Sequence, residues 1–302
     1  MQKQKYWLVT GATGRLGSAL VSRLLHNGHF VIGLGRSHPG LLAPATIKDP
    51  HFKLFLGDLA QGVPADIYHH NIEGIFHLAH QHNAARMPSK ALTQNIRMTR
   101  QIIAVSKQIK ISVLVYSSSG SVYEESSSYG RIKHLCELLI RKQLRTTTVR
   151  SIIVRLPAIY GPHDKESIIY RFIHWARTNQ DIVLDCQSKT ARSLLQTHQA
   201  ADILLKIASR YPYLPRHDLF MACSRDSMTV HEIAQLAVQA TGSKSKIIIP
   251  EQITPDNSAV LADARRIEKS LDIALPPFND SILSYIKKLS ASKRRATGTF
   301  KN

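Results

Sequence analysis

The stretch YWLVTGATGRLGSALVSRLLHNGHFVIGLGRS, residues 6–37, decides the fold. Its apolar run at 7–9 predicts a strand buried on both faces, and leucines at helical spacing from Leu16 to Leu25 predict a helix. Gly28 is placed to end that helix, and a second strand begins at Phe30. The stretch therefore predicts a strand, a turn, a helix and a strand, the unit from which parallel sheets are built.

Three glycines, Gly11, Gly14 and Gly17, occupy the turn between the first predicted strand and the helix. Glycines there permit a tight turn and a close approach of the backbone to a pyrophosphate, and the helix start supplies N–H donors. A glycine trio alone is a weak signal. The strand, turn and helix around this one predict a dinucleotide site rather than a turn without a ligand.

The end of the second predicted strand, GLGRS, indicates which dinucleotide binds. An acidic residue there would accept hydrogen bonds from the adenine ribose of NAD, whereas an arginine binds the 2′-phosphate of NADP. This chain has Arg36 and no carboxylate before Asp49, and Arg15 in the glycine turn adds a second cation. We therefore expect NADP(H) as the preferred cofactor and NAD(H) as the alternative.

Further strands are predicted at 52–59, 72–80, 111–119 and 151–162, with helices at 91–107 and 129–144 between them. This alternation predicts an α/β fold, a Rossmann-type doubly wound parallel sheet with a smaller C-terminal α/β substrate domain. After residue 162 the rhythm becomes irregular, and 218–223 is expected to rejoin the main sheet. The expected division is 1–161 plus about 197–224 for the NAD(P)-binding domain, about 162–196 plus 225–289 for the substrate-binding domain, and 290–302 as a basic, disordered tail.

The composition is that of a globular protein with an unusual positive charge. The net charge is +19, but the basic residues are scattered and no aromatic RNA-binding signature accompanies them. We interpret this as a surface that attracts phosphorylated substrates, and not as a nucleic-acid site. No apolar run approaches the ~20 residues of a membrane span. Cys136, Cys186 and Cys223 are widely spaced, which predicts a reducing cytoplasm and neither a disulfide framework nor a zinc site.

The serine-rich segment YSSSGSVYEESSSYGRIKHLCE, residues 116–137, contains a candidate catalytic group. Tyr129 and Lys133 are four residues apart and share one face of a predicted helix. An ammonium beside a tyrosine favours the phenolate and lowers its pKa from ~10 by ~1–3 units. A serine at the end of the neighbouring strand could hold a substrate oxygen, so the segment predicts a hydride-transfer site.

Several segments together resemble the extended short-chain dehydrogenase/reductases of the NAD(P)-dependent epimerase/dehydratase type, over residues 8–289. The segments are VTGATGRLG (9–17), GDL (57–59), FHLAH (76–80), TQNIRMT (93–99), SSSGSVY (117–123), YGRIKHLCE (129–137), VRLPAIYGP (154–162) and ARSLLQTHQAADIL (191–204). By this resemblance Tyr129 is the acid/base, Lys133 lowers its pKa and binds the nicotinamide ribose, and Ser119 hydrogen-bonds the carbonyl oxygen.

The resemblance and the motifs imply two further sets of contacts. The expected cofactor-binding residues are Gly11, Thr13, Gly14, Arg15, Leu16, Gly17, Arg36, Asp58, Leu59, Leu78, Ala79, His80, Asn95, Ser117, Tyr129, Lys133 and Leu156. The expected substrate contacts are His80, Ser119, Gly120, Ser121, Tyr123, Ala158 and Arg192, the last facing a substrate phosphate. No metal is expected, because His77, His80 and His82 lack a matching carboxylate or cysteine.

The sequence also departs from the pattern of this family. Only nine residues separate Ser119 from Tyr129, where relatives have a longer substrate-contacting loop. Gly120 and Ser121 replace the Asp-Glu pair of the dehydratases, so dehydration is not expected. Ala158 stands where nucleotide-sugar epimerases usually have asparagine, which weakens a sugar-nucleotide assignment.

The function predicted from the sequence is NADPH-dependent reduction of a keto-sugar nucleotide or similar polar metabolite. The alternatives are an NAD-dependent sugar-nucleotide epimerase and a non-catalytic NADP-binding regulatory or assembly protein. The expected partner is a small phosphorylated or nucleotide-linked substrate. A homodimer through the helices at 91–107 and 130–144 is also expected from the resemblance.

Overall fold

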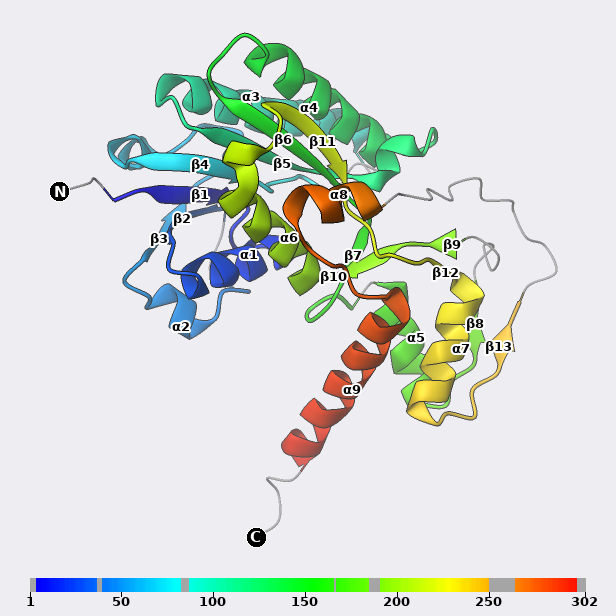
Figure 1. Cartoon of the computed structure of the whole chain (residues 1–302). Coiled ribbons are helices and arrows are strands. Elements are labelled where there is room, and N and C mark those ends of the chain that lie inside the picture. The colour runs from blue at the N-terminus through cyan, green and yellow to red at the C-terminus, as the bar shows by residue number, and fades with distance from the viewer. Residues whose placement is uncertain are drawn as a thin grey trace. The chain divides into compact units, whose positions relative to one another are not determined.

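The computed structural model describes residues 4–36, 40–82, 87–165, 167–184, 191–249 and 264–297. The chain forms two compact units, whose elements are labelled in Figure 1. The first unit consists of Met1–Leu156, Thr197–Ala222 and Lys269–Asp272. The second consists of Pro157–Gln196, Cys223–Glu268 and Ile273–Asn302. The chain thus leaves the first unit after Leu156 and returns to it at Thr197.

The first unit is built on a seven-stranded sheet in which all neighbouring strands are parallel. The strand order is β11-β6-β5-β4-β1-β2-β3. The strands are β1 (Tyr6–Thr10), β2 (Phe30–Gly35), β3 (Phe52–Leu56), β4 (Ile72–His77), β5 (Val113–Ser119), β6 (Arg150–Leu156) and β11 (His217–Met221). The order reverses at β1, which confirms the predicted doubly wound sheet, and the predicted late strand does return as β11.

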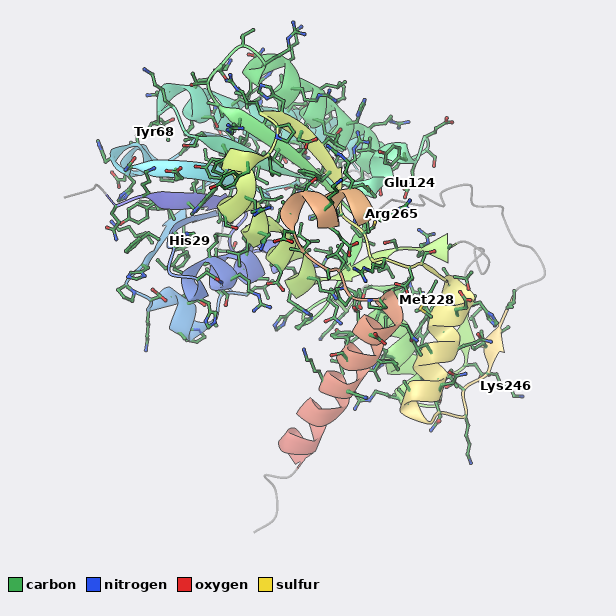
Figure 2. All side chains as sticks on the ribbon, viewed as in Figure 1. His29, Tyr68, Glu124, Met228, Lys246 and Arg265 are labelled. Carbon is green, nitrogen blue, oxygen red and sulfur yellow. The ribbon has the colours of Figure 1, made fainter. Side chains whose placement is uncertain are left out.

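Helices cover both faces of this sheet. They are α1 (Arg15–His26), α2 (Pro44–Ile47), α3 (Pro88–Gln108), α4 (Ser128–Leu144) and α6 (Thr197–Arg210), with single turns η1 (Ala65–His69), η2 (Gly120–Tyr123) and η3 (Tyr211–Tyr213). Helix α3 packs beside α4 on one face, and α1 packs beside α6 on the other (Figure 1). At the amino-terminal edge of the sheet, His29 packs edge-on against Trp7, with ring centroids 6.5 Å apart (Figure 2).

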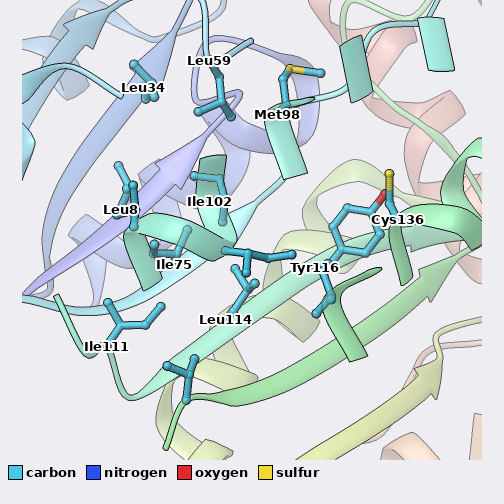
Figure 3. Packing of buried hydrophobic residues seen from close by; sticks show 14 of the residues in the cluster. Leu8, Leu34, Leu59, Ile75, Met98, Ile102, Ile111, Leu114, Tyr116 and Cys136 are labelled. Atoms are coloured by element: carbon cyan, nitrogen blue, oxygen red, sulfur yellow. The ribbon is translucent and has the colours of Figure 1, made fainter. Parts of the chain in front are cut away.

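The core of the first unit lies between the sheet and the helices α3 and α4. Leu8 of β1, Ile75 of β4 and Leu114 of β5 are fully buried there against Ile102 of α3 (Figure 3). Burial of each such side chain contributes about 1.5–3 kcal/mol. The apolar strands therefore fix the sheet firmly, and the polar residues of the same strands gather where the strands end.

The second unit contains short strands and helices. They are β7 (Ala158–Tyr160), α5 (Ile168–Arg177), β8 (Ile182–Val183), β9 (Ala191–Arg192), β10 (Leu194–Gln196), β12 (Met228–Thr229), α7 (Val230–Thr241), β13 (Ile247–Ile248) and α9 (Phe278–Thr297). Helix α8 (Ala264–Leu271) begins in the second unit and ends in the first. Helix α7 starts with a capping box between Thr229 and Glu232 and ends at Gly242, whose φ of 65° only glycine adopts readily. Helices α5, α7 and α9 enclose a separate hydrophobic core.

The structure differs from the sequence prediction in two places. The strand predicted over 151–162 is two strands, because Pro157 lacks an N–H for the ladder and β7 pairs with β10 instead of the main sheet. The tail predicted to be disordered from 290 is helical up to Thr297, since α9 continues through residues of fair helix propensity. Residues 298–302 lie outside the described residues.

Candidate functional site

The predicted site residues of the first unit lie at one edge of its sheet. Because the strands are all parallel, their carboxyl ends meet at that edge. The glycine turn follows β1, Arg36 follows β2, Asp58 follows β3, and His80 follows β4. The three serines end β5, and Leu156 ends β6. Ala158 and Arg192 belong to the second unit.

The glycine turn is closely packed and leads into an uncapped helix start. Gly11 has a φ of +72°, and both Gly11 and Ala12 donate their N–H to the carbonyl of Leu34, at 2.8 and 3.2 Å. A Cβ on Gly17 would lie 2.0 Å from the Gly11 carbonyl oxygen, so no side chain fits there. Helix α1 begins at Arg15 without a side-chain cap and without an acidic residue in its first turn. Such a helix start offers N–H donors to an anion, so these residues fit the pyrophosphate of a dinucleotide.

The ends of β2 and β3 place an arginine and a carboxylate beside this turn. Arg36 is exposed, and its Nη1 donates to Oε1 of Gln81 at 2.6 Å. Thr13 packs against Gly35, since a Cβ on Gly35 would lie only 2.6 Å from Cγ2 of Thr13. Asp58 is exposed and accepts from the N–H of Ala60 at 3.0 Å, which fixes the turn after β3.

A buried histidine anchors the segment that follows β4. Nδ1 of His77 lies 2.9 Å from Oγ1 of Thr10, and Nε2 lies 3.4 Å from Oγ1 of Thr99. Since the Thr99 hydroxyl donates to the Asn95 carbonyl, it accepts from Nε2, and Nδ1 accepts from Thr10. Burial lowers the pKa of His77 to about 3, so the imidazole is neutral and acts as a structural link.

Asn95 fixes the same segment from helix α3. Its Oδ1 accepts from the N–H of Gln81 at 3.0 Å, and its Nδ2 donates to the Gln81 carbonyl at 3.1 Å and to Ala91 at 2.7 Å. The amide is thus engaged with backbone groups on both sides. Asn95 was expected to bind cofactor; in the structure it holds the residues that follow β4.

The three serines at the end of β5 hold three successive turns of α4. The Ser117 carbonyl accepts from Nζ of Lys133 at 2.7 Å, and Ser119 hydrogen-bonds to Tyr129. The hydroxyl of Ser118 donates to Oε1 of Glu137. The structure therefore brings together Ser119, Tyr129 and Lys133 as the sequence predicted.

The protonation of this group differs from the expectation. Burial raises the pKa of Tyr129 to about 12, and the hydrogen bond with Ser119 opposes this only in part. Nζ of Lys133 lies 5.8 Å from the centroid of the Tyr129 ring and donates one hydrogen bond to the Ser117 carbonyl. Burial in turn lowers the pKa of Lys133 to about 8.

Two histidines pack around the Tyr129 ring. His80 meets it edge-on with centroids 4.9 Å apart, and His82 lies parallel to it at 6.3 Å. Nε2 of His80 is buried without a hydrogen-bond partner. Burial and the nearby Lys133 ammonium lower the pKa of both imidazoles, and Arg15 and Arg36 lower that of His82 further. Lys133, Arg15 and Arg36 therefore all lie near enough to His82 to disfavour its charged form.

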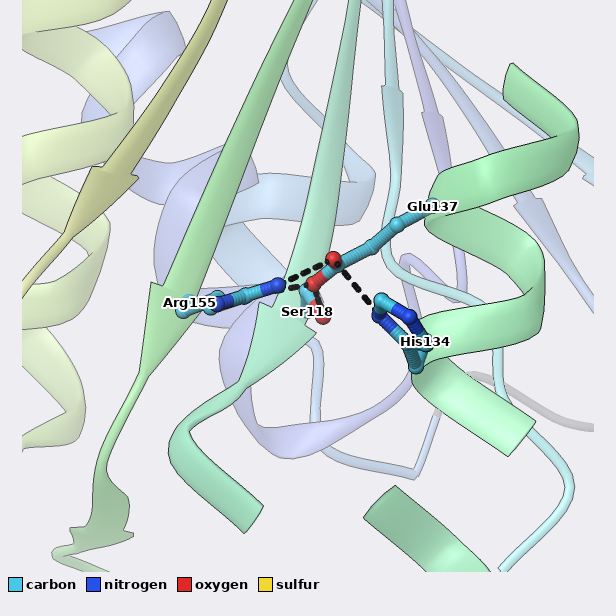
Figure 4. A network of polar contacts seen from close by, with 4 residues as sticks. All are labelled: Ser118, His134, Glu137 and Arg155. Atoms are coloured by element: carbon cyan, nitrogen blue, oxygen red, sulfur yellow. Dashed lines mark hydrogen bonds and ion pairs between the residues drawn. The ribbon is translucent and has the colours of Figure 1, made fainter. Parts of the chain in front are cut away.

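A buried ion pair between Glu137 and Arg155 lies next to Ser118 (Figure 4). The sequence did not predict it. Glu137 of α4 accepts from Nε of Arg155 at 2.9 Å and from Nη2 at 2.6 Å. Nδ1 of His134 approaches the same carboxylate at 3.6 Å. An arginine inside the apolar run of β6 was the signal available, because a charge in a buried strand needs a partner.

The nine-residue loop between Ser119 and Tyr129 is tightly docked. The N–H of Ser121 donates to Oγ of Ser119 at 3.1 Å, and Ser127 caps α4 by accepting from Gly130 at 3.0 Å. A Cβ on Gly130 would lie 1.8 Å from the Ser121 carbonyl oxygen. Tyr123 is 52% exposed and stacks on the Arg155 guanidinium, whose Cζ lies 4.7 Å from the centroid of the Tyr123 ring. The short loop is therefore ordered and presents one face of Tyr123.

Within the second unit, the two remaining candidates lie on short strands. Ala158 is exposed and pairs with Leu194 of β10, while Arg192 is half-buried and pairs with Met228 of β12. In the described part of the chain, no helix is long and apolar enough to cross a membrane. Among the same residues, no cluster of three or more His, Cys, Asp or Glu side chains could hold a metal.

Comparison with known proteins adds a family to this geometry. Residues 7–216 match the model described as "NAD dependent epimerase/dehydratase family". The chain is 25% identical over 249 residues to a CDP-abequose synthase from Salmonella muenchen, covering 80% of this chain and 82% of that protein. A UDP-glucose 4-epimerase from Rickettsia bellii is 25% identical over 256 residues, 80% of this chain and 73% of that protein. The solved structure of MoeE5 with UDP-glucose and NAD has a TM-score of 0.80 and 20% identity, covering 95% of this chain and 99% of that one.

Proposed function

Because the chain belongs to the NAD-dependent epimerase/dehydratase family, and so is an NAD(P)-dependent enzyme of the extended short-chain dehydrogenase/reductase type, we propose that it is a sugar-nucleotide epimerase. The sequence favoured reduction and gave epimerisation as the alternative. The relatives support epimerisation more, since their names include UDP-glucose 4-epimerase and one solved neighbour binds UDP-glucose with NAD.

The observation on which this proposal rests is the arrangement of Ser119, Tyr129 and Lys133 at the carboxyl edge of the sheet. The Ser119 hydroxyl is hydrogen-bonded to the Tyr129 phenol, and the buried Lys133 ammonium lies on the same helix face as Tyr129. The glycine turn that fits a pyrophosphate lies at the same edge. A non-catalytic nucleotide-binding protein would have no need to bury an ammonium next to a phenol, because that burial costs free energy.

The chemistry of epimerisation requires one proton to leave a substrate hydroxyl and later to return. To accept that proton Tyr129 must be a phenolate, which its pKa of about 12 disfavours at rest, and Ser119 can orient both the tyrosine oxygen and the substrate oxygen. The Lys133 ammonium favours the phenolate while the proton is shared, since opposite charges stabilise each other in a buried site. Bound NAD(P) would supply the exchange of hydride with the same carbon.

Reduction with NADPH is the second candidate, and Arg36 is the observation in its favour. Its guanidinium is exposed at the end of β2, where the 2′-phosphate of NADP would bind. Arg15 lies in the same region, because Arg15 and Arg36 both lower the pKa of His82. We therefore propose that the site accepts NADP(H) at least as well as NAD(H). Lys133, Tyr129 and the glycine turn would serve either cofactor.

The substrate proposed is a nucleoside-diphosphate sugar. The net charge of +19 favours such an anion, and Arg192 of the second unit is the proposed phosphate ligand. Tyr123, with one face on Arg155 and the other exposed, is the proposed platform for the sugar or base. The first unit would thus bind the cofactor and also contribute Ser119 and Tyr123 to the substrate site.

The test begins with the protein as purified. Acid release and chromatography identify any bound NAD or NADP, and UDP-glucose and UDP-N-acetylglucosamine are then incubated without added cofactor. Epimerised product supports the proposal, whereas stoichiometric NADPH consumption with a 4-keto sugar nucleotide supports reduction. Bound cofactor without either reaction would leave the non-catalytic alternative standing.

The matched variants are Tyr129→Phe and Tyr213→Phe. The first removes the proposed acid/base and should lower turnover by about 10²–10⁴-fold while cofactor still binds. The second removes a phenol that is 82% exposed and should change nothing. Undiminished turnover in Tyr129→Phe would exclude this residue as the acid/base.

The assembly and the location stay predictions. Leu135 and Leu138 of α4 are 44% and 47% exposed, which supports a homodimer through α3 and α4. Light scattering of the protein and of its Leu138→Glu variant tests this, because a charge in the contact should give monomers. Cys136 and Cys223 are buried thiols far apart in the sequence, which supports the predicted cytoplasmic location.

A further inference from the structure

The ion pair between Glu137 and Arg155 occupies a distinctive position relative to the proposed catalytic group. Glu137 lies one helical turn after Lys133, and Lys133 one turn after Tyr129, so all three share a face of α4. That face meets the three serines of β5, in the order Ser119, Ser117 and Ser118 along the helix. The Glu137 carboxylate binds Ser118. This serine stands between Ser117, the partner of Lys133, and Ser119, the partner of Tyr129.

Arg155 connects this helix to two further elements. Its side chain leaves β6 and reaches Glu137, while its backbone carbonyl accepts from Ala222, just beyond β11, at 2.9 Å. Its guanidinium face also supports the Tyr123 ring. One bidentate contact therefore joins the catalytic helix, the end of the sheet and the loop after Ser119.

Stability alone is a poor explanation for this pair. Glu137 is 1% exposed and Arg155 is 8% exposed, so both charges are taken out of water. The attraction between buried charges often no more than repays that desolvation, and well-packed apolar side chains of similar volume commonly serve as well or better. A bidentate pair does supply direction, because its planar groups accept few geometries.

We propose that Glu137 and Arg155 are positioning residues of the active site, which fix Lys133 and Tyr129 against the three serines and set the charge beside Lys133. The inference rests on the proposed function of Tyr129 and Lys133. It adds that the helix is held in register by a charge pair whose carboxylate favours the ammonium.

Groups from several elements surround the Lys133 ammonium. Burial lowers its pKa, and the charges that raise it come from Cys136 and Glu137 of α4. From β4 and the segment after it, His77, His80 and His82 face the ammonium, and all three are kept neutral by burial. From β5 only the Tyr116 ring, 5.0 Å away, and the Ser117 carbonyl approach it.

The first experiment compares Glu137→Gln with Arg155→Met. Glu137→Gln removes the charge that favours the ammonium, so the alkaline limb of kcat/KM should move about 0.5–1 pH unit lower. Arg155→Met leaves the carboxylate uncompensated, so the limb should move higher. Both variants should lower kcat about 10–100-fold with little change in KM. Arg155→Lys should keep only part of the wild-type kcat, because an ammonium cannot bind a carboxylate in the bidentate way of a guanidinium.

The same shifts are read without turnover by NADH and NADPH fluorescence titrations across pH. If the wild type turns over no sugar nucleotide, the proposed function fails, yet these titrations still test the inference. If the pH profiles of Glu137→Gln and Arg155→Met shift in the same direction, or do not shift, the inference is overturned. Asp202→Asn is the matched control, since it removes a carboxylate from the exposed pair with Arg23, and it should shift neither readout.

A double variant, Glu137→Leu with Arg155→Met, guards against simple unfolding. It replaces the pair by apolar side chains, which buried sites usually tolerate. A folded double variant with reduced kcat and a displaced pH profile supports a positioning role. Wild-type kcat, KM and pH profile in that variant would show that the pair is dispensable and would overturn the proposal.

Discussion

At the scale of single residues, three adjacent serines do three different things. Ser117 acts through its carbonyl, which receives the Lys133 ammonium, whereas Ser119 uses its hydroxyl for Tyr129 and for the N–H of Ser121. Ser118 uses its hydroxyl for Glu137. The residue type is the same, but the pleat turns successive side chains to opposite faces, and Ser117 contributes its carbonyl in place of its hydroxyl.

This division predicts different results from two similar substitutions. Ser117→Ala keeps the carbonyl that binds Lys133, so turnover should stay within about two-fold of the wild type. Ser119→Ala removes the hydroxyl beside Tyr129 and should lower kcat by about 10²-fold or more. Steady-state kinetics of the two variants decide the matter, and equal losses would contradict it.

The buried ammonium predicts opposite pH dependences for activity and for stability. Lys133 is charged below a pKa of about 8 and neutral above it, so activity that needs the ammonium should fall as pH rises through 8. Its pKa in the unfolded chain is the ordinary 10.5, so the cost of burying the charge is fully present below 8. That cost is relieved between 8 and 10.5, where the unfolded state binds more protons.

The check compares the wild type with Lys133→Met from pH 7 to 10. Thermal unfolding should show the wild type gaining stability relative to the variant as pH rises. The kcat/KM of the wild type should fall over the same range with the slope of one proton. A parallel fall of both quantities would contradict the assignment of the limb to Lys133.

At the scale of elements, the start of α4 and the loop before it form one packed joint. Gly130 lies against the Ser121 carbonyl, and the N-cap Ser127 holds the first turn. The nine-residue loop is held close to the helix, because its Ser121 backbone rests directly on the helix backbone at Gly130. Tyr129, the residue before the glycine, is fixed by the same contact.

Gly130→Ala should therefore disturb the site more than a helical alanine normally would. Its Cβ would lie 1.8 Å from a backbone oxygen, which must move, and overpacking of this kind costs about 1–3 kcal/mol. Gly57→Ala is the control, because its nearest contact would be Pro64 at an ordinary 3.4 Å. Denaturant unfolding and kcat measure both effects, and a loss in Gly57→Ala equal to that in Gly130→Ala would argue against the joint.

Elements also show where sequence reasoning succeeds and where it stops. Apolar runs and the glycine turn predict the strands and their parallel order, and the four-residue spacing predicts that Tyr129 and Lys133 share a face. Spacing gives no such rule for Glu137 and Arg155, which meet from different elements eighteen residues apart. The direction of the Tyr129 pKa also depends on burial, which no local pattern reveals.

At the scale of the whole molecule, the net charge of +19 should affect how substrate arrives. A positive surface raises the encounter rate with a nucleoside-diphosphate sugar, and salt screens that attraction over about 10 Å at 0.1 M. We expect kcat/KM to fall several-fold between 0.05 and 0.5 M NaCl while kcat stays nearly constant. Stopped-flow and steady-state assays at fixed pH measure this, with sucrose at equal osmolality as the control; a fall in kcat alone would contradict it.

The strand order also bears on how the protein is made. Strand β11 closes the sheet beside β6, yet the whole of β7 to α6 is synthesised between them. At ~5–20 residues per second, a ribosome leaves the edge of β6 unpaired for several seconds. During that interval its free N–H and carbonyl groups can pair with another nascent chain. The soluble yield of this protein is therefore expected to depend on translation speed and chaperone supply as well as on the stability of the finished fold.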